Sequence, residues 1–350
     1  MMDTSSVDDG LVHGIVLAAG EGRRLQVYVQ EIRSEPLPKQ YVNLIGRRSM
    51  LEHTFHRAER LIPAKQILTV VSRGHLLRAD VCRQLASRPR ETLIVQPANK
   101  ETGPGILLPL MFIYKRCPHA IVAVFPSDHF VLEEDRFMNH VKLAVQAARQ
   151  DPSRIVLLAI EPHEPETEYG YVIPHEEVGE RCRFGTKGVS AFIEKPRTEV
   201  ATKLMRAGGL WNTMTMVFNA GTLLQLVRRI HPVIYRGFSR IFEALGTRRE
   251  QPTIDAVYEK LESANFSKQI LETIAVDYPK SISVLPVREV FWSDLGSPER
   301  VLRVLRRFSH PQAEEIQTAP DYIKPRHAKQ RITGGQRSGR RESRIIHAWR

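Results

Sequence analysis

Two aspartates stand where the sequence could hold a divalent metal ion. Asp128 lies in FPSDHF, directly after the apolar run AIVAVF, and Asp294 lies in FWSDLGS, just before the last predicted helix. Carboxylate oxygens suit Mg²⁺, which commonly takes one or two carboxylates beside the phosphates of a substrate. The pair therefore predicts a magnesium site, and the alternative for each aspartate is a helix cap or an ordinary loop residue.

A glycine-rich segment with arginines predicts a phosphate-binding loop. The sequence GIVLAAGEGRRL leaves an apolar run through Gly20 and Gly22 and then reaches Arg24. Glycines let the backbone approach a phosphate group, and an arginine adds bidentate charge. Lys39, in LPKQY, is a second candidate cation. The segment lacks the third glycine of the dinucleotide fingerprint and the Gly-Lys-Ser/Thr of a P-loop, so the alternative is a tight turn with surface arginines.

Short apolar runs separated by amphipathic segments predict the elements that position these residues. The apolar runs are 14–19, 67–72, 92–96, 120–125 and 154–160. Helical patterns lie at 49–61, 103–116 and 135–150. Strands that are apolar on both faces belong to sheets covered by helices, so the predicted fold class is α/β, with three layers and a mostly parallel central sheet. Ligands bind at the carboxyl ends of such strands, where the glycines and Asp128 stand.

The pattern changes after position 160. Strand-like segments separated by turn residues, at 169–176, 188–196 and 213–220, predict a small antiparallel element. Helical patterns at 223–245 and 255–272, a strand at 281–287 and a helix at 297–308 follow. The final helix is expected to have Ser297 as its N-cap and Pro298 at its first position.

Length and charge define the organisation of the chain. Its 350 residues, 42% of them hydrophobic, suffice for one large domain, predicted over 1–308. The net charge of +12 favours anionic partners. Residues 309–350 are rich in Gly, Ser and Arg without periodicity, and they predict a disordered basic tail. Such a tail could bind RNA, a membrane surface or an acidic partner, but no nucleic acid is expected as a partner of the folded part.

Cysteine usage and hydropathy indicate the compartment. Cys82, Cys117 and Cys182 form no CxxC pair, so neither a disulfide framework nor a cysteine zinc site is expected. No stretch approaches the ~20 apolar residues of a membrane span, and the opening MMDTSSVDDG has no apolar signal-peptide core. The expected location is cytoplasmic, and a homo-oligomer is an open alternative to a monomer.

Eight motifs, in their order, resemble the sugar-phosphate nucleotidyltransferase family, and within it the mannose-1-phosphate guanylyltransferases. The motifs are LAAGEGRRL, PKQY, QPANKETGPGI, FPSDH, EYGYV, FIEKP, WNTMTMVF and FWSDLGS. The resemblance covers roughly residues 12–308. It implies a Rossmann-like nucleotidyltransferase fold and the transfer of GMP from GTP to mannose 1-phosphate, which releases pyrophosphate and forms GDP-mannose.

The resemblance also implies a role for each residue that matches a family motif. Arg24, Lys39 and Asp128 would be catalytic, and Asp128 with Asp294 would hold Mg²⁺. The implied nucleotide-binding residues are Ala18, Ala19, Gly20, Gly22, Arg24, Gln96, Pro97, Asn99, Thr102 and Gly103. The implied sugar-phosphate-binding residues are Gly170, Glu194, Lys195 and Asn212.

Several residues depart from the family pattern. Segment 26–38 is longer and lacks an early Pro-Leu pair, Glu168 replaces a Gly before GYGY, and Met214 replaces a small Gly beside the predicted sugar site. Another nucleoside triphosphate or hexose 1-phosphate is therefore an alternative substrate pair. Further alternatives are a glycosyltransferase that uses a nucleotide sugar and a non-catalytic nucleotide- or RNA-binding protein.

Overall fold

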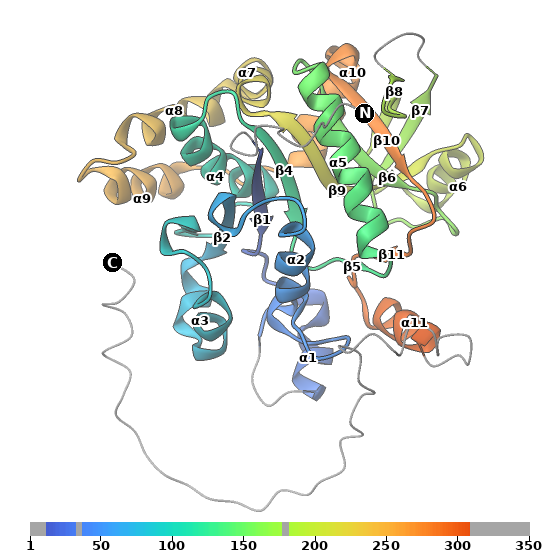
Figure 1. Ribbon diagram of the computed structural model, residues 1–350, viewed down its shortest axis with the longest axis horizontal. Coiled ribbons are helices and arrows are strands. Elements are labelled where there is room, and N and C mark those ends of the chain that lie inside the picture. The colour runs from blue at the N-terminus through green and yellow to red at the C-terminus, as the bar shows by residue number, and fades with distance from the viewer. Residues whose placement is uncertain (1–11, 33–36, 177–181, 309–350) are drawn as a thin grey trace, which may run out of the picture.

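The computed structural model describes residues 12–32, 37–176 and 182–308, and a nine-stranded mixed sheet forms its centre (Figure 1). The strand order is β3-β2-β1-β4-β9-β6-β10-β8-β7. The strands of this sheet are β1 (Val12–Leu17), β2 (Ile67–Ser72), β3 (Leu93–Gln96), β4 (Ile121–Pro126), β6 (Ile155–Ile160), β7 (Tyr171–His175), β8 (Lys187–Ile193), β9 (Leu210–Asn219) and β10 (Ile282–Val287). A separate two-stranded sheet pairs β5 (Phe130–Val131) with β11 (Trp292–Ser293).

The large sheet has a parallel half and a half dominated by antiparallel pairing. Strands β3, β2, β1 and β4 pair in parallel, as do β6 and β10. Strand β9 lies antiparallel between β4 and β6, and β7 pairs antiparallel with β8 and with β9. The predicted α/β class is confirmed, and the antiparallel part extends into the centre of the sheet because β9 reverses direction there.

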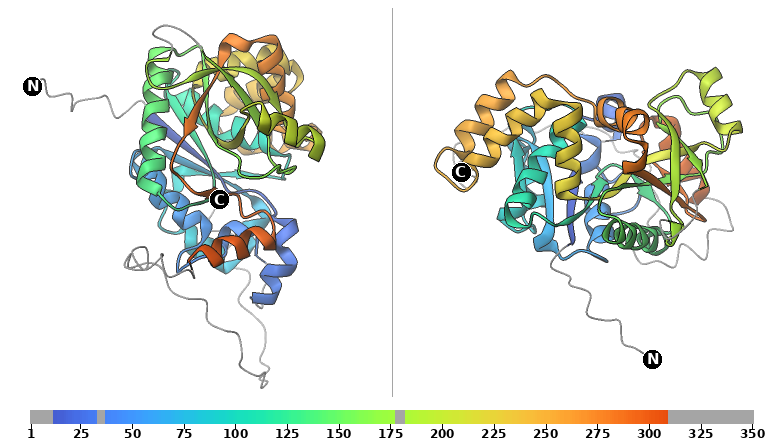
Figure 2. Two further views of the ribbon diagram at one scale, coloured as in Figure 1. Left: turned by 90° about the vertical axis from the view of Figure 1, so that its right-hand side faces the viewer. Right: turned by 90° about the horizontal axis from the view of Figure 1, so that it is seen from above.

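Helices cover both faces of the sheet, which completes the three predicted layers (Figure 2). One hydrophobic cluster packs α2 (Met50–Ala58) and α5 (Glu134–Gln150) against one face. The other cluster packs α4 (Thr102–Arg116), α7 (Ala220–Ile230) and α8 (Pro232–Ala244) against the opposite face. Strands β2 and β4 are buried along their whole length, as strands covered on both faces must be.

The remaining helices surround this core. They are α1 (Gln26–Ile32), α3 (Ala79–Leu85), α6 (Thr198–Arg206), α9 (Glu250–Lys260), α10 (Glu272–Asp277) and α11 (Pro298–Phe308). In Figure 1, α1 and α11 lie in the lower part, with β5 and β11 between them and the large sheet. The sequence patterns did not predict α1, α3, α6 or the β5–β11 pair, which are short.

Two predicted helices end or begin elsewhere in the structure. The single helix expected over 223–245 is divided into α7 and α8, because Pro232 lacks an N–H and starts a new helix. The single helix expected over 255–272 is wrong, since α9 spans Glu250–Lys260 and a π-helical turn at Ser267–Leu271 leads into α10. The predicted cap is confirmed: the Arg300 N–H donates to Ser297 Oγ at 3.4 Å, and α11 begins at Pro298.

The predicted basic tail at 309–350 lies outside the described residues. In the part of the chain that is described, a search for helices long and apolar enough to cross a membrane finds none.

Candidate functional site

The glycine-rich loop is fastened to the segment that carries Lys39. Gln40 Nε2 donates to the carbonyls of Ala18 and Gly20, at 2.8 Å each. Gly22 has φ +62°, and a Cβ there would lie 3.0 Å from the Lys39 backbone nitrogen. A residue with a side chain would be strained in this conformation and would push the two segments apart. The glycine therefore serves a close approach that brings Lys39 to the end of β1.

Lys39 joins the two predicted metal ligands. Its Nζ lies 2.9 Å from Asp128 Oδ2 and donates to the backbone carbonyl of Asp294 at 3.0 Å. The lysine side chain is 12% exposed and that of Asp128 is 31% exposed, so the ammonium is largely buried and the carboxylate still reaches solvent. The structure thus brings together Lys39, Asp128 and Asp294 from segments far apart in the chain.

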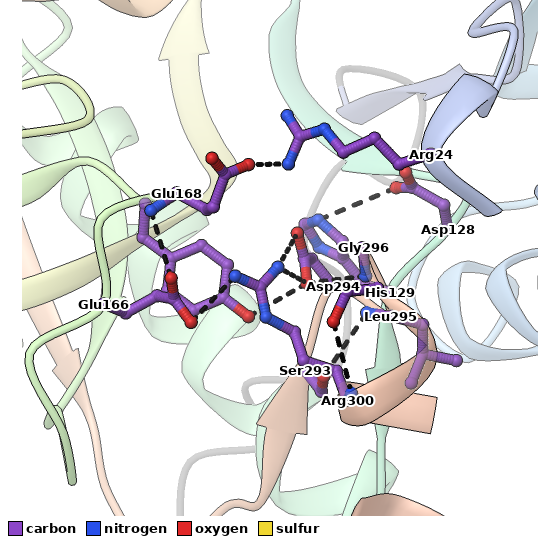
Figure 3. Close-up of polar contacts among 12 residues, drawn as sticks. Arg24, Asp128, His129, Glu166, Glu168, Ser293, Asp294, Leu295, Gly296 and Arg300 are labelled. Atoms are coloured by element: carbon purple, nitrogen blue, oxygen red, sulfur yellow. Dashed lines mark hydrogen bonds and ion pairs between the residues drawn. The ribbon is translucent and has the colours of Figure 1, made fainter. Parts of the chain in front are cut away.

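His129 adds a buried neutral ring beside Asp128 (Figure 3). Its Nε2 lies 3.7 Å from Asp128 Oδ1, and its Nδ1 accepts a hydrogen bond from Trp292 Nε1 at 3.3 Å. Burial lowers the pKa of His129 to about 4, and Lys39 contributes to the lowering. Burial alone would raise the pKa of Asp128, but Lys39, His129 and the hydrogen bonds to the carboxylate together outweigh burial, and the pKa is lowered. Asp128 is therefore ionised at neutral pH beside a neutral imidazole.

The carboxylate of Asp294 is held by three residues. Arg300 donates from one guanidinium nitrogen to both carboxylate oxygens, at 2.8 and 3.0 Å. Tyr169 Oη and the Gly296 N–H donate to Oδ1, each at 2.9 Å. Burial, followed by the charge of Asp294, raises the pKa of Tyr169, so the phenol keeps its proton and stays a donor. The Asp294 side chain is 21% exposed.

Arg24 contacts an acid from the other side of the site. It forms an ion pair with Glu168, which belongs to the loop between β6 and β7 (Figure 3). Both side chains are well exposed. A charge pair that exposed is weak, and an anionic ligand can replace the carboxylate.

The predicted sugar-phosphate residues gather around Gly170. The Asn212 N–H donates to the Gly170 carbonyl at 2.8 Å, and the Lys195 N–H donates to the Tyr169 carbonyl at 3.2 Å. A Cβ at Gly170 would lie 2.6 Å from Glu194 Oε2, so only glycine fits there without displacing that carboxylate. Burial raises the pKa of Glu194, an effect that Lys195 opposes. Glu194, Gly170, Lys195 and Asn212 are thus one cluster.

Backbone strain is concentrated in the predicted site motifs. Lys195 (φ +48°), Met214 (φ +55°), Glu101 (φ +70°) and Leu295 (φ +46°) adopt the left-handed region without being glycines. Such residues cost free energy and persist where the surroundings fix them, commonly at functional sites. At Met214 the backbone is one that glycine adopts readily, although the chain carries a side chain there whose sulfur accepts a hydrogen bond from Ser267 Oγ at 2.9 Å.

The predicted nucleobase segment is tied to the same neighbourhood. The Gly103 N–H donates to the Ala264 carbonyl at 2.8 Å, and Thr102 Oγ1 accepts from the Phe266 N–H at 2.9 Å. Asn99 Oδ1 accepts from the Glu101 N–H at 3.0 Å, which shapes the turn before α4. Gln96 ends β3, and its Oε1 is buried without a hydrogen-bond partner among the described residues. Ala19 lies in the loop after β1, and Pro97 lies in the loop after β3.

Several residues of the site were not predicted from the sequence. They are Gln40, His129, Glu166, Tyr169 and Arg300. Gln40, His129 and Tyr169 lie inside predicted motifs, and Glu166 lies two residues before one, but none of the four was assigned a role. Arg300 did leave a signal, because it lies in the first turn of α11, where the helix dipole favours acidic side chains. An arginine in that place indicates a specific carboxylate partner.

Hard oxygen ligands for a magnesium ion are present in modest number. The described residues contain no group of three or more His, Cys, Asp or Glu side chains placed to hold a metal. Mg²⁺ commonly takes one or two protein carboxylates and retains several waters, so Asp128 and Asp294 fit its donor requirement. Asp128 is partly exposed with one oxygen on Lys39, whereas Asp294 shares both oxygens with Arg300.

The fold and the site define a class of protein. The three-layer α/β domain is accompanied by a family match, since the family model for nucleotidyl transferase matches residues 13–309. The chain belongs to that family.

Two curated proteins show which members of the family this chain is similar to. The xanthan biosynthesis protein XanB of Xanthomonas campestris is 28% identical over 293 residues, which cover 83% of this chain and 58% of that protein. Mannose-1-phosphate guanylyltransferase 2 of Escherichia coli O157:H7 is 27% identical over 306 residues, with 83% and 59% covered. The chain therefore spans less than two thirds of the length of these curated relatives.

A solved structure supports the fold. A crystal structure from Thermus thermophilus, described as a mannose-1-phosphate geranyltransferase, has a TM-score of 0.70 and 26% identity. The match covers 86% of this chain and 80% of that one. A Helicobacter pylori structure described as a mannose-6-phosphate isomerase, at 21% identity and a TM-score of 0.62, shares the fold, and the match covers 81% of this chain and 99% of that one.

Proposed function

We propose that this chain transfers GMP from GTP to mannose 1-phosphate, releasing pyrophosphate and forming GDP-mannose. An oxygen of the sugar phosphate would attack the α-phosphorus of GTP, and the bond from that phosphorus to the bridging oxygen of pyrophosphate would break. A phosphate monoester is already anionic at neutral pH, since its second pKa lies near 6. The attack thus needs no general base, and catalysis rests on positioning and on charge.

The phosphate side supplies the positive charge. Arg24 would exchange Glu168 for a phosphate of GTP, and Lys39 would neutralise the phosphates at the reacting centre. The amides of the loop through Gly20 and Gly22 would donate to the triphosphate, with Ala18 and Ala19 at its start. Two anionic substrates repel one another, so fixed cations at their meeting point lower the barrier.

Asp128 and Asp294 would hold Mg²⁺ on this side. When bound, the ion supplies positive charge beside the phosphate oxygens. Lys39 fixes the orientation of Asp128 through the 2.9 Å contact with Oδ2, so Oδ1 is the oxygen that would be offered to a cation. Because the His129 ring is neutral, it does not compensate the negative charge of Asp128 near Oδ1.

The sugar side would bind mannose 1-phosphate. Glu194 would accept hydrogen bonds from sugar hydroxyls, Gly170 and Asn212 would line the sugar, and Lys195 would contact its phosphate. The segment with Gln96, Pro97, Asn99, Thr102 and Gly103 would lie against the guanine and ribose. The buried acceptor oxygen of Gln96 supports this placement, because a buried amide oxygen without a partner favours a donor from a ligand.

The bridge made by Lys39 between Asp128 and Asp294 is the observation that carries the proposal. The cation of Lys39 lies between the carboxylate of Asp128 and the backbone carbonyl of Asp294, beside the glycine loop. Pyrophosphate release measured with each of four nucleoside triphosphates, against mannose 1-phosphate and glucose 1-phosphate, tests it. The expected result is the highest kcat/KM for GTP with mannose 1-phosphate.

Other results of that experiment identify the alternatives. Turnover of UTP with glucose 1-phosphate and none with GTP would refute the guanylyl assignment. Sugar transfer from GDP-mannose to an acceptor without pyrophosphate would indicate a glycosyltransferase. GTP binding without any turnover across the panel would indicate a non-catalytic nucleotide-binding protein.

A further inference from the structure

Arg300 occupies a position in α11 that disfavours a positively charged side chain. It lies in the first turn of the helix, close to the partial positive charge of the N-terminus. Its side chain is 8% exposed, so the guanidinium has exchanged most of its water for protein partners. A buried and charged arginine sits directly against a predicted metal ligand.

Donors are distributed unevenly over the two oxygens of the Asp294 carboxylate, each of which offers about two lone-pair positions. Oδ1 receives contacts from Tyr169, Gly296 and Arg300, whereas the contact to Oδ2 comes from Arg300. A divalent ion that binds Asp294 would therefore approach Oδ2, where it meets the positive charge of Arg300. The Arg300 contact to Oδ2, at 3.0 Å, is the longest of the four.

Arg300 has a second anchor that it would keep. Its other terminal nitrogen lies 2.8 Å from Glu166 Oε2 (Figure 3). Its guanidinium carbon lies 4.5 Å from the ring centre of Tyr169. Glu166 is 18% exposed, similar to Asp294. The arginine is thus shared between two carboxylates, and loss of one contact leaves it paired with the other.

We propose that Arg300 competes with the divalent metal for Asp294 and thereby sets the metal affinity of the site, with Glu166 as the carboxylate that retains Arg300 when the metal binds. This inference rests on the metal site of the proposed function. It separates the two acids: Asp128 is the ready ligand, with Lys39 on one oxygen, and Asp294 binds the metal against the charge of Arg300, which contacts both of its oxygens.

Binding of Mn²⁺ alone, followed by electron paramagnetic resonance of the free ion, tests the proposal without turnover. Arg300→Met removes the competing charge at similar length and should lower the Kd for Mn²⁺ by about tenfold. Arg300→Lys keeps one charge without the bidentate geometry and should lower it by about threefold. Glu166→Gln removes the second anchor, so Arg300 should bind Asp294 more firmly and the Kd should rise.

Arg303→Met is the matched control. Arg303 lies on the same helix and forms an ion pair with Glu164, which lies with Glu166 in the loop between β6 and β7. Its loss removes an equal charge from α11 while leaving the Arg300 contacts in place, so the Kd for Mn²⁺ should stay within about twofold of the unmodified chain. Circular dichroism and thermal melting establish that each variant is folded.

The outcomes are distinct. Tighter Mn²⁺ binding in Arg300→Met and Arg300→Lys, with no change in Arg303→Met, supports the competition. An unchanged or higher Kd in a folded Arg300→Lys variant overturns it, as does an equal gain in the control. If Arg300→Met does not fold, Arg300→Lys and Glu166→Gln still decide. Because no substrate is present, these results stand whether or not the chain makes GDP-mannose.

Discussion

The proposed phosphate side and the proposed sugar side of the site are built in different ways. On the phosphate side, charged side chains meet in pairs: Lys39 with Asp128, Arg24 with Glu168, and Arg300 with Asp294. On the sugar side there is one such pair, Lys195 with Glu194 at 3.7 Å, and backbone contacts join the segments, since the N–H groups of Asn212 and Lys195 donate to the segment 169–170. The sugar side also holds two of the strained residues, Lys195 and Met214.

This contrast indicates how each side receives its ligand. The pair of Arg24 and Glu168 is well exposed, and the carboxylates of Asp128 and Asp294 are partly exposed, so a triphosphate and a metal ion would be able to take over charges that the protein satisfies internally. Strained backbone and a glycine without room for a Cβ give a fixed shape, which suits recognition of a neutral ring. The phosphate side is therefore expected to respond to charge substitutions, and the sugar side to small changes in volume.

The largest effect is expected at Asp128. Replacing it with Asn removes the negative charge that would hold the metal and leaves the shape almost unchanged. Turnover should fall by about 10³-fold in a pyrophosphate release assay, in the range seen when one key electrostatic group is removed. An unchanged melting temperature would show that the fold is intact, and full activity in this variant would refute the metal role.

The next effect concerns stability in acid. His129 has a pKa lowered to about 4 in the folded chain, against about 6.5 when unfolded, so protonation favours unfolding. Its contribution is complete above pH 6.5 and is lost as the pH falls toward 4, a change of about 3 kcal/mol in the free energy of unfolding. Denaturant titrations at several pH values should show a smaller acid loss in His129→Asn. Equal pH profiles for the two proteins would contradict the buried neutral imidazole.

A smaller effect is expected at the exchangeable pair of Arg24 and Glu168. Arg24→Gln removes a charge-assisted contact to the triphosphate and should raise the KM for GTP by about 30-fold. Glu168→Gln removes the internal competitor and should lower that KM. Steady-state kinetics at fixed mannose 1-phosphate measure both, and a rise in KM in both variants would show that the pair is structural.

The smallest effect is expected at Gly170. A Cβ there would press on Glu194 Oε2, at 2.6 Å, and on the ring of Phe192, at 3.2 Å. Gly170→Ala should raise the KM for mannose 1-phosphate by about tenfold, and the KM for GTP should not change. Gly105→Ala is a suitable control, because a Cβ at Gly105 meets nothing within 4 Å. A rise in both KM values would place Gly170 outside the sugar site.

Much of the fold could be predicted from hydrophobic runs. Strand β2 matches its predicted range, β4 is shifted by one residue at both ends, and β6 begins one residue later, because strands buried on both faces leave an uninterrupted apolar signal. Strand β9 also appeared as a strand, but its place between β4 and β6 could not be deduced. Strand order depends on long-range packing, to which local periodicity gives no access.

The candidate site was likewise predictable from the sequence only in part. The residues that match motifs could be named, and the structure brings Lys39 and Asp128 into direct contact. The partners that hold Asp294 could not be named from the sequence. Tyr169 and Arg300 contact its carboxylate from positions 125 and 6 residues away in the chain. Ion pairs of this kind are formed by the tertiary fold, so the internal competition for Asp294 becomes visible only in three dimensions.

One measurement tests nucleotidyl transfer most directly. Mannose 1-phosphate labelled with ¹⁸O on all four phosphate oxygens is incubated with GTP and the enzyme, and the products are analysed by mass spectrometry. Attack of the sugar phosphate on the α-phosphorus predicts GDP-mannose that retains every label and pyrophosphate that carries none. Loss of label from the sugar nucleotide, or labelled pyrophosphate, would contradict the account.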